Sequence, residues 1–118
     1  MKVYVCTPLA AQKQSKVASN NSKMVSIAKA YLGKDIEVVS NYEKEVPDVS
    51  DNLKIAAYVV SQVTALAGCE YFVFADARFG FTECRVLKEI AECLSIPVLY
   101  IDAAYLDFEE EKEDEKDS

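Results

Sequence analysis

The sequence predicts an α/β fold, a three-layer sandwich in which helices cover both faces of a parallel sheet of four to five strands. Three observations support this prediction. Short apolar runs alternate with segments of helical spacing, in the order β-α-β-α-β-α-β. The run 71–75 is apolar or aromatic throughout and precedes a glycine-bearing loop, as a buried parallel strand does. The length of 118 residues allows one domain with a core and is too short for two.

The first half of the chain contains two predicted strands and one predicted helix. Residues 2–6 form a short apolar strand that ends before Pro8. Residues 10–21 are polar and weakly patterned, so they are either a long loop or a loop that turns into a helix. A helix is predicted from Ser22 until Gly33 stops it, and residues 35–39 form the second strand. The expected buried face of this helix consists of Met24, Ile27, Ala28, Tyr31 and Leu32.

The second half repeats the alternation. A loop at 40–50 leads to a helix that ends at Gly68, with Ser50 or Asp51 as its N-cap. The strand 71–75, a helix from Glu83 to about Leu94 and a fourth strand at 96–101 follow. The expected buried faces of the two helices consist of Ala56, Val59, Val60, Val63, Leu66 and Ala67, and of Val86, Leu87, Ile90, Ala91 and Leu94.

This order of elements predicts where a ligand binds. Right-handed crossovers and a Rossmann-like or flavodoxin-like strand order of 2-1-3-4 place the topological switch point between the first and third strands. The loops that leave these strands are 7–21 and 76–82. The candidate ligand-binding residues are therefore Thr7, Pro8, Leu9, Asp76, Ala77, Arg78, Phe79, Gly80, Phe81, Thr82, Glu83 and Arg85.

Several candidates have a functional and a structural interpretation. The only two arginines, Arg78 and Arg85, suit a phosphate, although an exposed arginine is ordinary. Phe79 and Phe81 can stack on a base, or fill the core or a dimer contact. Asp76 can bind a ribose hydroxyl or shape a turn.

The start of the third helix carries two further candidates. Glu83 is either a nucleophile or acid-base carboxylate, or a first-turn acid that complements the helix dipole. Cys84 has no accompanying base, which favours a structural role. Elsewhere, Asn20, Asn21 and Ser22 can donate to a ligand, but capping the first helix is the favoured role.

Composition excludes several function classes. The net charge of −7 is concentrated in residues 107–118, which hold eight acids and two lysines, so we expect one domain over 1–106 and an acidic flexible tail. The chain has no histidine, which removes triads, Cys-His dyads and HExxH zinc sites. No duplex nucleic acid, membrane, metal or cofactor is expected, and the four cysteines suit buried, reduced thiols in a cytoplasmic protein.

Four segments resemble the nucleoside 2-deoxyribosyltransferase-like superfamily, in particular its small phage-borne branch. They are Thr7-Pro8, the helix 22–32, the segment 77–91 and Ile96-Pro97-Val98. The resemblance implies that a nucleoside or nucleotide binds at the cleft and that a homodimer or higher homo-oligomer shares residues across its interface. It also places Leu87 where the enzymes of this family have a glutamate nucleophile, which implies binding without turnover.

The chain is also similar to the Thoeris anti-defence sponges. That similarity implies sequestration, in a host cytoplasm, of a nucleotide-type signal such as a cyclic ADP-ribose isomer or a cyclic oligonucleotide. Two alternatives remain. One is a nucleoside 2-deoxyribosyltransferase or N-glycosidase that uses Glu83 with Asp76 assisting. The other is an adaptor whose acidic tail binds a basic partner.

Overall fold

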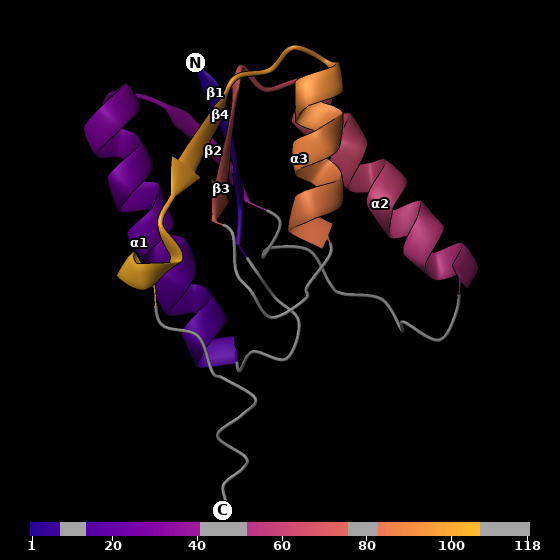
Figure 1. The fold of residues 1–118 in the computed structure, drawn as a ribbon, viewed down its shortest axis with the longest axis horizontal. Coiled ribbons are helices and arrows are strands. Elements are labelled where there is room, and N and C mark those ends of the chain that lie inside the picture. The colour runs from indigo at the N-terminus through magenta and orange to yellow at the C-terminus, as the bar shows by residue number, and fades with distance from the viewer. Residues whose placement is uncertain (8–13, 41–51, 76–82, 107–118) are drawn as a thin grey trace, which may run out of the picture.

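The computed structural model describes residues 1–7, 14–40, 52–75 and 83–106. Seven helices and strands and one 3-10 turn follow one another in these segments (Figure 1). They are β1 (Lys2–Cys6), α1 (Gln14–Leu32), β2 (Glu37–Ser40), α2 (Asn52–Ala67), β3 (Tyr71–Ala75), α3 (Glu83–Cys93), β4 (Val98–Ile101) and the turn η2 (Ala103–Tyr105).

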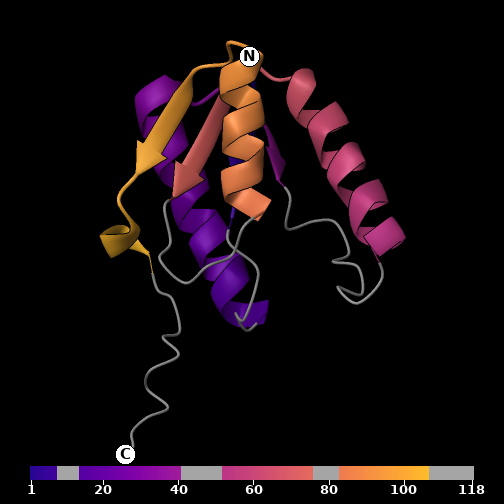
Figure 2. The same cartoon turned by 45° about the vertical axis from the view of Figure 1, so that its right-hand side comes forward.

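The four strands form one all-parallel sheet in the order β2-β1-β3-β4. This confirms the predicted α/β architecture and strand order. The strand β1 lies in the interior of the sheet, with Val3 opposite Val38 of β2 on one side and opposite Tyr71 of β3 on the other. Helix α1 covers one face of the sheet and helices α2 and α3 cover the other, as Figures 1 and 2 show.

The core is divided by the sheet into two clusters, because successive strand residues point to opposite faces. Val3 and Val5 pack with Met24 and Ala28 under α1. On the other face lies a cluster under α2 and α3 that consists of Tyr4, Cys6, Leu66, Cys69, Phe72, Phe74, Cys84, Leu87 and Ala91. Both faces of β1 are buried, which explains why its sequence is apolar at nearly every position.

Helix α1 differs from the prediction at its start. It begins at Gln14, eight positions before the predicted start at Ser22, so the loop after β1 is shorter than expected. Asn20, Asn21 and Ser22 lie inside this helix, and the two asparagines are buried, so the prediction that these residues cap it is wrong. The apolar periodicity of the sequence did not reveal the first part of this helix, before Ser22, because two inward-facing positions carry amides instead of apolar side chains.

The C-terminal end of α1 lies where the sequence predicted it. Gly33 follows the last turn of α1 with a φ of 118°, and its N–H donates to the Lys29 carbonyl at 2.9 Å, which confirms it as the stop.

Several apolar residues predicted to be buried are exposed instead. They are Tyr31 in α1, Ala56, Val60 and Ala67 in α2, Val86 in α3, and Leu94 just after it. No helix in the described segments is long and apolar enough to cross a membrane.

Candidate ligand site at the carboxyl edge of the sheet

The carboxyl ends of the parallel strands lie at one edge of the sheet, the lower edge in Figure 1. Each helix runs opposite in direction to the strand that precedes it, so α1, α2 and α3 all begin on the lower side in Figure 1. Neither α1 nor α2 has an acidic residue in its first turn. Acids of their own first turns therefore do not offset the partial positive charge at the N-terminal ends of α1 and α2, which favours an anion here.

A buried polar cluster joins three elements at this edge. Oδ1 of Asn21 on α1 accepts hydrogen bonds from Oγ1 of Thr7, which follows β1, and from Oγ of Ser40, the last residue of β2, each at 3.0 Å. Thr7 is completely buried, and Asn21 and Ser40 are nearly so. The cluster therefore fixes the exits of β1 and β2 relative to the first half of α1.

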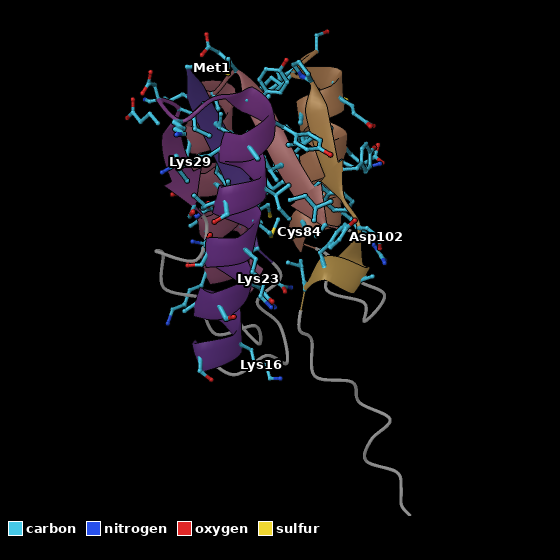
Figure 3. The ribbon with its side chains drawn as sticks, turned by 90° about the vertical axis from the view of Figure 1, so that its left-hand side faces the viewer. Met1, Lys16, Lys23, Lys29, Cys84 and Asp102 are labelled. Carbon is cyan, nitrogen blue, oxygen red and sulfur yellow. The ribbon has the colours of Figure 1, made fainter. Side chains whose placement is uncertain are left out.

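A pair of thiols lies at the same end of β1, on the opposite face of the sheet. Sγ of Cys6 is 2.9 Å from Sγ of Cys84, and the Cys84 thiol also donates to the Cys6 carbonyl at 3.6 Å. These contacts hold the first turn of α3 against the end of β1. All four cysteines are free thiols, and three are buried as expected, whereas Cys93 is exposed. Figure 3 shows Cys84 in the interior, with Lys16, Lys23 and Lys29 along α1.

The predicted ligand-binding residues are only partly among the described ones. Thr7 lies at the edge, but its hydroxyl is committed to Asn21. Arg85 lies in the first turn of α3 and is exposed, and Glu83 is the first residue of that helix. Pro8, Leu9 and residues 76–82 lie outside the described residues, so their roles stay predictions.

Leu87 has a clear structural role. Its side chain is completely buried in the cluster with Tyr4, Phe72 and Phe74. A carboxylate at this position would be enclosed by apolar groups, and an unpaired buried charge is costly. Leucine at position 87 is therefore explained by core packing. Glu83, one helical turn earlier, begins the helix at the carboxyl edge.

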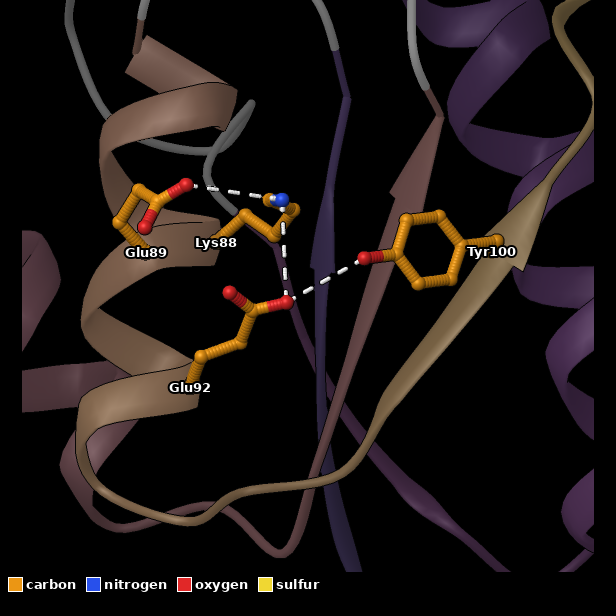
Figure 4. A network of polar contacts seen from close by, with 4 residues as sticks. All are labelled: Lys88, Glu89, Glu92 and Tyr100. Atoms are coloured by element: carbon orange, nitrogen blue, oxygen red, sulfur yellow. Dashed lines mark hydrogen bonds and ion pairs between the residues drawn. The ribbon is translucent and has the colours of Figure 1, made fainter.

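A second polar network lies away from this edge, between α3 and β4 (Figure 4). Lys88 Nζ is 3.6 Å from Glu89 Oε2 and 3.7 Å from Glu92 Oε2, and the Tyr100 hydroxyl donates to Glu92 at 3.3 Å. Nζ also lies 5.9 Å from the ring centroids of Phe74 and Tyr100. Desolvation alone would lower the pKa of Lys88, but the Glu92 carboxylate, helped by Tyr100 and Glu89, outweighs it, so the pKa is raised above 10.5.

A wide, shallow hollow of about 410 Å³ borders this network. Its walls are Glu92, Ser95, Ile96, Pro97, Val98 and Tyr100. It lies at the amino end of β4, whereas ligands of open α/β sheets bind beyond the carboxyl ends. Its one carboxylate already pairs with Lys88 and Tyr100. We therefore place the candidate site at the carboxyl edge and not at this hollow.

Sequence reasoning missed two of these arrangements. The i,i+4 spacing of Lys88 and Glu92 was the available signal for their ion pair. The available signal for Asn21 was its place three residues before Met24 and four after Val17, on the buried stripe of α1. Among the residues that the structure describes, no group of His, Cys, Asp and Glu could hold a metal ion. No protein-family model matches the chain, and no curated protein matches it significantly.

Proposed function

We propose that this protein binds a nucleotide-type, anionic ligand at the carboxyl edge of its sheet and sequesters it without chemical change. The observation that supports this most is the meeting, at one edge, of the α1 and α3 N-termini with the exits of β1 and β3. In a sheet of order 2-1-3-4 this is the switch point, where ligands of such folds bind. The Asn21 cluster and the Cys6–Cys84 contact hold both sides of this region in place.

The residue types near this edge favour binding over catalysis. The described buried polar groups at this edge are hydroxyls, an amide and thiols, and the chain has no histidine to act as a base at neutral pH. The proposed contacts come from the sequence. Arg78 and Arg85 neutralise phosphate, Phe79 or Phe81 stacks on a base, and Asp76 and Glu83 accept from ribose hydroxyls.

The proposed ligand class follows from the resemblance to phage-borne sponges. It comprises cyclic ADP-ribose isomers and cyclic oligonucleotides, held in the host cytoplasm. The test is calorimetry and thermal unfolding with these ligands and with deoxynucleosides, followed by chromatography of each recovered ligand. A ligand that binds only the folded state adds about 2.7 kcal/mol at a hundredfold excess over its Kd. We expect a cyclic nucleotide to stabilise the protein and to be recovered intact.

Consumption of a deoxynucleoside with release of free base would contradict this proposal and would identify an enzyme, and loss of that activity in Glu83→Ala would assign the nucleophile. For binding, Arg78→Ala should abolish the stabilisation by a phosphate-bearing ligand. The matched control is Lys29→Ala, since Lys29 is an exposed cation in the last turn of α1, at the opposite edge. Equal affinity of Arg78→Ala and wild type would exclude the phosphate role.

A further inference from the structure

Helix α2 exposes a row of uncharged side chains along its whole length. The row consists of Leu53, Ala57, Val60, Thr64 and Ala67, which we call the α2 seam. The two large members are strongly exposed, Leu53 at 82% and Val60 at 64%. The steps between members are four, three, four and three residues, which is the heptad spacing of a helix that packs along another helix.

The seam lies on the side of α2 turned away from the core. Among the side chains of this helix that the structure describes, Gln62 and Leu66 are buried, and they lie opposite the seam on the helical wheel. In Figures 1 and 2, α2 lies at the outer side of the helical layer, beyond α3, and no described element covers its far side. The apolar surface of the seam is therefore open to a partner.

The one polar group within the seam is already paired. Oγ1 of Thr64 donates to the carbonyl of Val60 at 2.9 Å, one turn earlier in the same helix. A partner that covers the seam therefore leaves no new hydrogen-bonding group of the seam unsatisfied. This distinguishes the seam from an ordinary solvated helix face, which carries charges.

We propose that the α2 seam pairs with the α2 seam of a second copy of this chain, antiparallel, across a two-fold axis that passes by Val60. Val60 is the midpoint of the seam. Antiparallel pairing sets Leu53 of one copy against Ala67 of the other, and Ala57 against Thr64, so large residues meet small ones at both ends. Parallel pairing would set Leu53 against Leu53 and Ala67 against Ala67, and the two helices would diverge at one end.

The charges of α2 also fit an antiparallel copy of itself. The helix has no acidic residue in its first turn and no basic residue in its last turn. An antiparallel neighbour places the negative end of one dipole beside the positive end of the other. It also brings Lys54, the only charged residue of α2, close to the C-terminal end of the second helix.

Two other possible partners of the α2 seam, the acidic tail and a lipid surface, fit it less well than a second copy. Residues 107–118 carry eight acids and a single aromatic residue, Phe108, and this composition does not match an apolar seam. An anionic lipid surface attracts helices with several basic residues beside the apolar face, whereas α2 has one lysine and the chain has a net charge of −7. A second copy of the same uncharged surface meets neither obstacle.

The size of the contact sets the expected affinity. The seam is about 21 Å long at 1.5 Å per residue, and a single pair of helices of this length buries less than the roughly 800 Å² per partner of a stable complex. We therefore expect a reversible dimer with a dissociation constant on the order of 10–100 µM. Sedimentation equilibrium of the full chain across this range should show monomer at low and dimer at high concentration.

Engineered cysteines test the geometry. In a Cys93→Ser background, which removes the exposed native thiol, Val60→Cys should form a disulfide-linked dimer rapidly on treatment with diamide. Two Val60 positions face each other across the axis, whereas the two Leu53 positions lie about 21 Å apart along antiparallel helices, beyond the roughly 7 Å that a disulfide spans. Leu53→Cys should therefore not link to itself, and Val86→Cys, exposed on α3, is the second control.

A charge in the seam tests the interface without cysteine chemistry. Val60→Glu should remain monomeric at concentrations where the wild type is dimeric, while Val86→Glu should dimerise as the wild type does. The inference is overturned if the wild type stays monomeric throughout, if Val60→Glu dimerises normally, or if Leu53→Cys links faster than Val60→Cys. A dimer that appears only when residues 107–118 are deleted would assign the seam to the tail and would also overturn it.

Discussion

At the scale of single residues, Asn21 holds together parts of the chain that are far apart in sequence. One carbonyl oxygen accepts from two buried hydroxyls, on Thr7 and Ser40, so losing it removes the acceptor of two buried hydrogen bonds. Each buried unsatisfied group costs about 1–3 kcal/mol, so Asn21→Ala should lower the free energy of unfolding by at least about 2 kcal/mol. Urea unfolding measures this, with Ser26→Ala on the exposed side of α1 as the control. Equal effects of the two variants would contradict the role given to Asn21.

Cys69 gives the protein a pH dependence at the residue scale. Burial raises the pKa of its thiol above 9.0, assisted by Glu37 and Glu70 and opposed by Lys2. The folded state therefore keeps the proton at a pH where the unfolded chain releases it. The contribution of this thiol to the free energy of unfolding has its full value below pH 9.0, and it decreases as the pH rises from there through the pKa of the folded state. The stability of the wild type should fall relative to Cys69→Ala between about pH 8 and about pH 10. An equal pH dependence of the wild type and Cys69→Ala would contradict this role of the Cys69 thiol.

At the scale of elements, the strands were easier to predict than the helix faces. A strand buried on both sides is a short apolar run, and 2–6 and 71–75 are such runs. Helix α1 starts earlier than its apolar pattern because Asn20 and Asn21 face inward, and α2 exposes Val60 because it lies at the outer side of its layer. Hydrogen bonds such as that between Asn21 and Ser40 depend on how a helix packs on a sheet, and the periodicity of apolar residues does not predict this packing. Most predicted ligand contacts fall in 76–82, outside the described residues.

Substitutions in helix α3 test whether Leu87 belongs to the core or faces the ligand site. Leu87→Ala should lower the free energy of unfolding by about 2–5 kcal/mol, as buried leucines do, whereas Val86→Ala on the exposed side should change it by about 0.5 kcal/mol or less. Leu87→Glu should destabilise the protein further and should not create hydrolysis of deoxynucleosides, because its carboxylate would enter the apolar cluster. A folded Leu87→Glu variant that releases free base would show that this position faces the ligand.

At the scale of the whole molecule, most of the net charge lies in residues 107–118, whereas we expect the residues before them to determine the free energy of unfolding. Residues 107–118 carry −6 of the net charge of −7, whereas Leu106 still packs against the core under α1. Truncation after Leu106 should therefore change the free energy of unfolding by no more than about 0.5 kcal/mol. Leu106→Ala in the truncated protein should cost about 1 kcal/mol, since that side chain is only partly buried. Thermal or urea unfolding decides, and a large loss from truncation alone would place the tail within the domain.

The interior position of β1 has a consequence for how this molecule folds. β1 precedes both of its neighbours, and its pairing with β3 joins Val3 to Tyr71, so the chain must close a long loop before β1 gains its second partner. Proteins dominated by such distant pairings fold more slowly than helical bundles. During synthesis at about 5–20 residues per second, the apolar β1 emerges seconds before β3. Over that interval, the strand that ends up in the interior of the sheet presents an open edge to its surroundings.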